Sequence, residues 1–229
     1  MNDIFYIGAY WKNRKQKLDV LLSPTLTLLE GLARMDDQFL DLFEKGNSRS
    51  QALKSKVLKT EDELCRLFLK RTKKNDIDSN GYSSIGYRLS FWNGQGDGQA
   101  SSISFSLGTN SDILSNYVLI DLPSEGVLKE RLLQIDIVLQ IIELLITNFN
   151  PEVIVLNSRR LQAELDSVDD VGWVSYKKNI SRKFRMSDDN IVHVSNYMGG
   201  HLFYLKNESG KAYNYSSIAH LKGLTKSLF

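Results

Sequence analysis

The hydrophobic and polar positions of the chain follow two periods, one typical of helices and one typical of strands. Apolar residues recur every three to four positions over 15–34, 61–71, 125–148 and 218–228, which predicts amphipathic helices with one buried stripe. Runs of β-branched and aromatic residues between Gly, Asn, Asp and Ser predict β-strands. The predicted strands are 4–10, 85–92, 102–107, 117–121, 153–156, 173–176, 191–195 and 202–205.

The stretch from 83 to 123 contains three of these strands in succession, and we expect this meander at the centre of the sheet. The long helix predicted over 125–148 then separates strand 117–121 from the continuous apolar run 153–156. A strand, a helix and a buried strand form a βαβ unit, in which the two strands run parallel. The sequence therefore predicts an α+β fold with a mixed, largely antiparallel sheet, one βαβ crossover and flanking amphipathic helices.

The chain shows no internal repeat and no linker with a sharp change of composition, and its 229 residues are enough for one large domain. We expect a single domain over 1–229. In this domain a helical N-terminal part, about 15–71, packs on a sheet formed by 4–10 and 84–205.

Several local signals refine the predicted helices and turns. Ser23-Pro24 interrupts the pattern of 15–34, so this helix either kinks there or starts there. Short helices are predicted over 49–56 and 159–165, a short amphipathic turn or helix is predicted over 36–43, and Gly199-Gly200 predicts a tight hairpin turn. Two capping boxes, in which each side chain bonds the other residue's backbone N–H, are Ser48 with Gln51 and Thr60 with Glu63.

The composition limits the cellular setting more than the function. The formal net charge is only +2, so the overall charge does not favour a nucleic-acid partner. The single cysteine, Cys65, cannot form an internal disulfide and fits a reducing compartment. The N-terminus lacks the pattern of a secretory signal, and charged residues interrupt the apolar stretch 128–146. We therefore expect a cytoplasmic protein without a membrane anchor.

No pattern of catalytic, cofactor-binding or metal-binding residues stands out. The glycines of 94–98 precede a predicted strand, whereas a phosphate-binding loop leads into a helix, so a hairpin loop is favoured. His193 and His201 flank the turn at 199–200, but with His220 they do not form a ligand set for zinc. A GxSxG nucleophile motif is absent. We expect no enzyme activity, no cofactor and no metal.

Two basic stretches, 54–74 and 177–185, leave open an alternative function as a nucleic-acid-binding regulatory protein. Basic residues interleaved with aromatic ones can bind phosphates and stack on bases. Both stretches lie beside acidic clusters, however, and a run of charges is more often a solvated face.

The three tryptophans, Trp11, Trp92 and Trp173, each begin or end a predicted strand. Large aromatic side chains serve either as core residues or as anchors of an interface. We expect packing more often than binding. If Trp92 lies in the core, its replacement by alanine should lower the stability by about 3 to 5 kcal/mol.

Short stretches along the chain form an ordered set: YIGAYW at 6–11 with Arg14, GNSRSQA at 46–52, GYRLSFWNG at 86–94, the segment 116–123, VGW at 171–173 and the pair at 199–200. In this order the chain resembles the bacterial polymorphic-toxin immunity proteins of the immunity protein 52 family. The residues that carry the resemblance are Gly8, Tyr10, Trp11, Arg14, Gly86, Trp92, Gly94, Gly172, Trp173, Gly199 and Gly200.

The resemblance implies a non-catalytic cytoplasmic protein that binds and neutralises a cognate toxin in bacterial competition, with type VI secretion as the associated route. Such families look to be paired with DNA-cleaving toxins of the restriction-endonuclease-like class. The nearly neutral charge of this chain departs from a DNA mimic, so the expected mechanism is occlusion by a local patch or locking of the toxin. A homodimer is left open.

Our hypothesis for the partner surface combines the loop 93–99 with the acidic segment 164–170. A nuclease cleft is basic, and opposite charge speeds and orients the encounter. The residues expected to contact the partner are Trp92, Asn93, Gln95, Asp97, Glu164, Asp166, Asp169 and Asp170.

Overall fold

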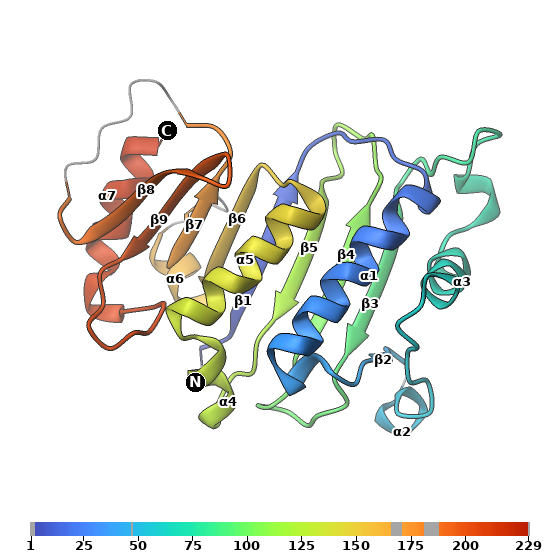
Figure 1. Cartoon of the computed structure of the whole chain (residues 1–229), viewed down its shortest axis with the longest axis horizontal. Helices are drawn as coiled ribbons and strands as arrows, with labels where there is room; N and C mark the ends of the chain where they lie inside the picture. The colour runs from blue at the N-terminus through green and yellow to red at the C-terminus, as the bar shows by residue number, and fades with distance from the viewer. Residues whose placement is uncertain (1–2, 47, 166–170, 181–187, 229) are drawn as a thin grey trace.

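One sheet of nine strands runs through the computed structural model, which describes residues 3–46, 48–165, 171–180 and 188–228 (Figure 1). Its strand order is β2-β3-β4-β5-β1-β6-β7-β9-β8. The strands are β1 (Phe5–Trp11), β2 (Phe43–Glu44), β3 (Tyr87–Trp92), β4 (Ser102–Leu107), β5 (Asn116–Asp121), β6 (Val153–Ser158), β7 (Val174–Lys177), β8 (Ile191–Tyr197) and β9 (Gly200–Leu205). The α+β class and the meander β3-β4-β5 are confirmed.

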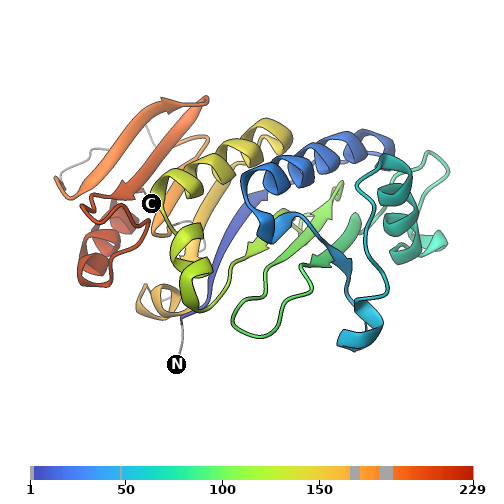
Figure 2. The same ribbon diagram turned by 60° about the horizontal axis from the view of Figure 1, so that its bottom comes forward.

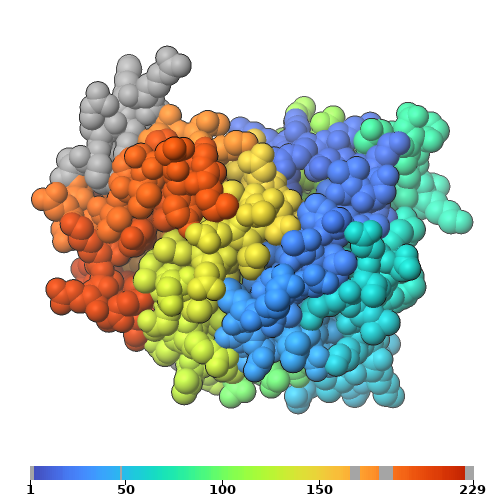
Figure 3. All heavy atoms as spheres, in the orientation of Figure 1, coloured from blue at the N-terminus to red at the C-terminus, as the bar shows by residue number. Residues whose placement is uncertain are grey.

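Helices cover the two faces of the sheet unequally. On one face α1 and α5 lie side by side, with α3 next to α1 (Figures 1 and 2). On the other face α6 and α7 lie at the β6-to-β8 side, and the space-filling view shows the face that α1 and α5 cover (Figure 3). The helices are α1 (Leu18–Met35), α2 (Arg49–Ala52), α3 (Glu61–Arg71), α4 (Gly126–Leu132), α5 (Ile135–Phe149), α6 (Arg159–Glu164) and α7 (Ile218–Leu228).

The expected crossover exists, but its two strands are not neighbours. β1 pairs antiparallel with β5 on one side and with β6 on the other, so β5 and β6 run parallel with β1 between them. Every strand pair among the described residues is therefore antiparallel, and the expectation of a mixed sheet was wrong in this respect. In this central place the side chains of Ile7 and Ala9 have no exposed surface.

The core lies between the sheet and the α1–α5 layer. In β3 and β5 every second side chain is buried, as expected for a sheet with one covered face, whereas β4 between them is buried at every position except Ser104. α5 buries Val138, Ile142 and Leu145 completely against this face. Arg88, in contrast, is exposed on the opposite face of β3. This alternation decides which side chains a partner can reach.

Three predicted helices differ from the structure in their limits or their continuity. The helix predicted over 125–148 is two helices, because Gln134 is extended and the N–H of Ile135 bonds to the carbonyl of Gly210. α1 neither starts nor ends at Pro24 but runs through it. The helix predicted over 49–56 ends at Ala52, whereas the turn considered over 36–43 is present at 37–39 and is followed by β2 from Phe43.

In both predicted capping boxes the hydroxyl of the N-cap residue accepts the expected hydrogen bond. The Ser48 hydroxyl accepts from the N–H of Gln51, and the Thr60 hydroxyl accepts from the N–H of Glu63, each at 3.3 Å.

In the described part of the chain, each helix is too short or too polar to cross a bilayer.

Candidate partner-binding surface

The end of β3 meets β2 and α2 at one corner of the molecule, which we call the β2–β3 corner (Phe43, Arg49, Leu53, Trp92 and Gly94). Phe43 pairs with Trp92 across the two strands, and their ring centroids are 6.4 Å apart. Arg49 Nη2 lies 3.4 Å from the carbonyl oxygen of Gly94. The corner thus joins the stretches 46–52 and 86–94, which are distant in sequence.

Gly94 is required where the loop leaves β3. Its φ of +77° lies in the left-handed region, and a Cβ there would be 2.8 Å from the Phe43 ring and 3.2 Å from Leu53. The loop then returns into β4 and not into a helix. The hairpin interpretation is therefore confirmed over the phosphate-loop one.

Asn93 organises this loop from inside. Its Oδ1 accepts from the N–H of Gln95 at 3.2 Å and of Ser101 at 3.1 Å, while its Nδ2 donates to Gln38 Oε1 at 2.7 Å. Only 5% of Asn93 is exposed, so its side chain holds the loop and is not presented to a partner. Gln95 and Asp97 are exposed on the outer side of the loop.

The three tryptophans have different environments. Trp173 is fully buried and its Nε1 donates to Ser158 Oγ at 3.2 Å. Trp11 is buried against Phe149, with centroids 5.7 Å apart. Trp92 is only half-buried and lies on the face away from α1 and α5. Core packing therefore describes Trp11 and Trp173, whereas water still reaches part of Trp92.

The acidic half of the predicted surface is described only in part. Glu164 is exposed at the end of α6 and lies 3.7 Å from Lys222 Nζ. Asp166, Asp169 and Asp170 lie outside the described residues.

The loop and α6 nevertheless lie at the same end of the sheet. The register places Trp92, Ser102, Asp121, Tyr6 and Asn157 in one row across β3, β4, β5, β1 and β6. Four inter-strand spacings separate the ends of this row, or about 19 Å at about 4.8 Å each. One protein partner can span this distance, since a standard interface buries about 800 Å² per partner.

Arg159 and Arg160 are exposed at the start of α6, so this end of the sheet is not uniformly acidic. Asp121 contributes a half-buried carboxylate there and accepts from Ser102 Oγ at 2.5 Å. The arrangement suits discrete charge contacts better than a continuous imitation of DNA.

The basic stretch 54–74 is largely neutralised by local contacts. Lys56 pairs with Asp41 at 2.8 Å and Arg66 with Glu63 at 2.8 Å. Lys70 and Arg71 both pair with Glu44. In the second stretch Lys177 is buried, Lys178 Nζ donates to Asn150, and 181–187 lie outside the described residues. The described residues thus do not form a contiguous basic face for nucleic acid.

Other residues of the ordered stretches stabilise the sheet. Arg14 bonds the carbonyl oxygens of Phe149 and Asn150, which caps α5. Gly8 lies under the ring of Tyr10, since a Cβ there would be 2.3 Å from Tyr10 Oη. The remaining glycines lie at turns or strand ends: Gly86 before β3, Gly172 before β7, Gly199 in the β8–β9 turn and Gly200 at the start of β9.

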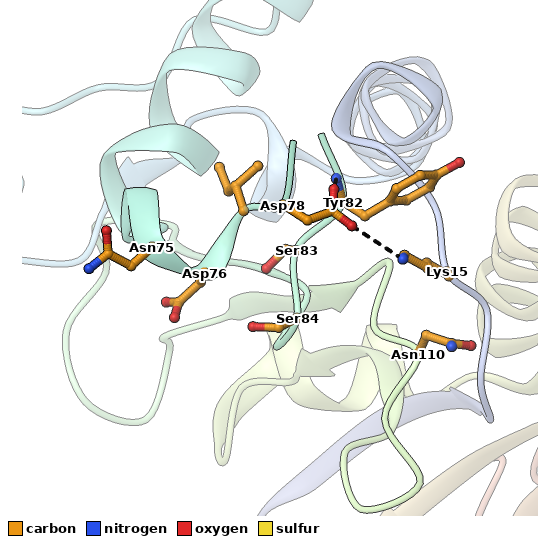
Figure 4. Close-up of a pocket in the computed structure, with 9 residues that line it drawn as sticks. Lys15, Asn75, Asp76, Asp78, Tyr82, Ser83, Ser84 and Asn110 are labelled. Carbon is orange, nitrogen blue, oxygen red and sulfur yellow. Dashed lines mark hydrogen bonds and ion pairs between the residues drawn. The ribbon is translucent and has the colours of Figure 1, made fainter. Parts of the chain in front are cut away.

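Two further sites bring together polar side chains of the kinds that enzymes use. A pocket of about 310 Å³ lies near the other end of β3, where Lys15 Nζ is 3.4 Å from Asp78 Oδ2 and 4.4 Å from the Tyr82 ring centroid (Figure 4). Backbone N–H groups of Tyr82 and Asn80 lower the pKa of Asp78, so this carboxylate stays ionised near neutral pH. It is not poised to transfer a proton.

His193 and His201 contact each other across the hairpin, with Nε2 and Nδ1 3.1 Å apart. Burial, together with the charge of His201, lowers the pKa of His193. Among the described residues, no group of three or more His, Cys, Asp or Glu side chains is placed to hold a metal ion.

Sequence reasoning missed Phe43, Arg49 and Leu53 as parts of the candidate surface. The only available signal was the stretch 46–52, whose capping box places Arg49 in the first turn of α2. Phe43 belongs to a strand of two residues, too short to produce a periodic pattern.

The chain was also compared with known proteins. The family model described as immunity protein 52 matches residues 3–184. No curated protein matches the chain.

Proposed function

The chain belongs to the immunity protein 52 family, and is thus an immunity protein against a toxin, and we propose that this toxin is a DNA-cleaving nuclease of the restriction-endonuclease-like class. The proposed mechanism is direct binding that occludes the active site or locks the toxin in an inactive shape. The proposal places the encounter in the cytoplasm, where the DNA substrate is found.

The observation that supports this proposal most is the rigid loop of the β2–β3 corner. Its exposed side chains, Gln95 and Asp97, are carried on a loop that Asn93 fixes from inside. A preorganised loop loses less conformational entropy on binding than a mobile one. Phe43, Leu53 and Trp92 provide apolar area beside it, and aromatic residues dominate the energy of many interfaces.

The charges favour local contacts with a basic nuclease cleft. Asp97, Asp121 and Glu164 lie along one end of the sheet, but Arg159 and Arg160 are exposed near Glu164. With a formal net charge of +2, the chain as a whole does not resemble DNA. Carboxylates placed opposite single cations of the toxin can still orient and speed association.

Co-expression with the toxin encoded beside this chain tests the function. We expect rescue of growth, co-purification of the two proteins and inhibition of plasmid cleavage by the purified toxin domain. Rescue without DNA cleavage by the toxin alone would retain the immunity function and overturn the nuclease assignment. Binding of DNA by the chain itself, with strong salt dependence, would instead favour the regulatory alternative.

Charge reversal tests the proposed surface. Replacing Asp97, Asp166, Asp169 and Asp170 together with lysine should weaken toxin binding at least tenfold, mainly through slower association. Asp97→Lys alone can be compared with Asp112→Lys, a reversal of an exposed carboxylate on the β4–β5 turn at the other end of the sheet. Equal affinities of the quadruple variant and the wild type would exclude this surface.

A further inference from the structure

A buried carboxylate holds two cations on the other side of β2. Glu44, the second residue of this strand, is 7% exposed. Its Oε2 lies 2.8 Å from Lys70 Nζ, and its Oε1 lies 2.9 Å from Arg71 Nη2. The pKa of Glu44 is lowered: burial opposes its ionisation, but the hydrogen bonds and charges of Lys70 and Arg71 outweigh that effect. Glu44 therefore places a negative charge at the floor of this cluster near neutral pH.

Lys70 and Arg71 keep N–H groups that do not bond to Glu44. Arg71 donates from Nε and Nη2 to Glu44 and from Nη2 to the carbonyl oxygen of Lys45. Both N–H groups of Nη1 are without a hydrogen bond in the described part of the chain. The Lys70 ammonium has three N–H groups and gives one to Glu44. The Arg71 side chain is 40% exposed and the Lys70 side chain is 56% exposed.

These groups line a pocket of about 340 Å³ together with Lys45, Gln51 and Ser55. The lining carries three cations and one carboxylate, so its net charge is positive. The segment with α2 and α3 is at the molecular surface beside α1 (Figure 3). Because Lys45, Lys70 and Arg71 are all exposed to solvent, the pocket is accessible from outside and suited to an anion.

We propose that this pocket, the β2 anion pocket (Glu44, Lys45, Gln51, Ser55, Lys70 and Arg71), receives an acidic side chain of the toxin. This inference rests on the proposed function and adds a second contact to the β2–β3 corner. Phe43 and Glu44 point to opposite sides of the same strand, so a partner that covers this edge of the sheet can reach both Phe43 and the cations above Glu44.

Glu44 prepares the pocket for such a ligand. A guanidinium fixed by a carboxylate and a carbonyl oxygen keeps its free N–H groups in one direction, which reduces the entropy lost on binding. A carboxylate of the partner can accept from Arg71 Nη1 and from Lys70, with Lys45 at the rim. The contact complements Asp97 on the loop 93–99, because the immunity protein then offers both a carboxylate and cations to the toxin.

The test uses the full chain and the toxin domain encoded beside it. Lys45→Glu should weaken binding about tenfold, and Lys70→Gln should weaken it less, because Arg71 keeps its bonds to Glu44. Lys73→Glu, an equal charge change at an exposed lysine outside the pocket, should stay within about twofold. Urea unfolding of each variant shows whether the fold is retained.

The outcomes separate this inference from the proposed function. If the wild type neither binds nor protects, the proposed function fails. If the wild type binds but Lys45→Glu and Lys70→Gln bind equally well, only the pocket assignment fails. Thermal stabilisation by inorganic phosphate that these two variants abolish, without a change in toxin affinity, would assign the pocket to a free oxyanion and overturn the proposal.

Discussion

The centre of the sheet and the β2–β3 corner are held together by different forces. In the centre, Ile7, Ile142 and Leu156 have no exposed surface and pack between β1, β6 and α5. At the corner, Leu53 is 41% exposed, and the loop is fixed by the polar side chain of Asn93. Burial of apolar area stabilises the first region, whereas specific hydrogen bonds shape the second.

This difference indicates how stability and binding are divided in the molecule. Apolar side chains that are already buried cannot contact a toxin, and those at the corner contribute less to folding because water still reaches them. Substitutions in the two regions should therefore affect different measurements.

The largest effect is expected in the centre. Ile142→Ala should lower the free energy of unfolding by about 2 to 5 kcal/mol, because it removes methyl groups from a site without exposed surface and leaves a cavity. Urea unfolding followed by circular dichroism measures the change. Gln140→Ala on the exposed side of the same helix is the matched control and should stay within about 0.5 kcal/mol. Equal losses in both variants would contradict the assignment of this core.

The centre was also the region that the sequence predicted best. Periodic apolar residues placed α1, α3 and α5, and the N-cap of α3 was visible as Thr60. The break at Gln134 was missed because it depends on a bond from Ile135 to Gly210, far along the chain. The insertion of β1 between β5 and β6 was missed for the same reason: pairing across long sequence separations leaves no local pattern.

At the corner, local patterns carried little information. The glycines correctly predicted a hairpin, but an Asn before Gly is also common in exposed turns, so the inward orientation of Asn93 was not foreseeable. The role of Phe43 depends on its pairing with Trp92 across a strand of two residues. Residues 166–170 carry three of the predicted contacts and lie outside the described residues, so that part of the surface stays a prediction.

A smaller loss of stability and a larger loss of binding are expected at Trp92. Because this side chain is only half-buried, Trp92→Ala should lower the free energy of unfolding by about 1 kcal/mol, less than the core value considered from sequence alone. Toxin affinity should fall at least tenfold if the indole is an anchor of the interface. Calorimetric titration and urea unfolding on the same sample separate the two effects. Unchanged toxin affinity together with a fall in the free energy of unfolding above about 3 kcal/mol would show that Trp92 is a core residue and not an interface anchor.

The smallest effect concerns pH and distinguishes the edge at β2 from the centre. The folded-state pKa of Glu44 lies below the unfolded value of about 4.3, so its contribution is complete above that pH and is lost as the pH falls through the folded pKa. At about pH 7, Glu44→Gln should be less stable than the wild type by no more than about 1 kcal/mol, since Lys70 and Arg71 are partly exposed and can be hydrated.

Below the folded pKa of Glu44 the two proteins should become equally stable, because the wild-type carboxyl is then neutral as well. Urea unfolding of both proteins across this pH range measures the difference. Ile142→Ala provides the contrast, since a cavity among apolar side chains does not titrate and its deficit should persist at every pH. A Glu44→Gln deficit that remains constant down to low pH would show that packing, and not the charge of Glu44, stabilises β2 against α3.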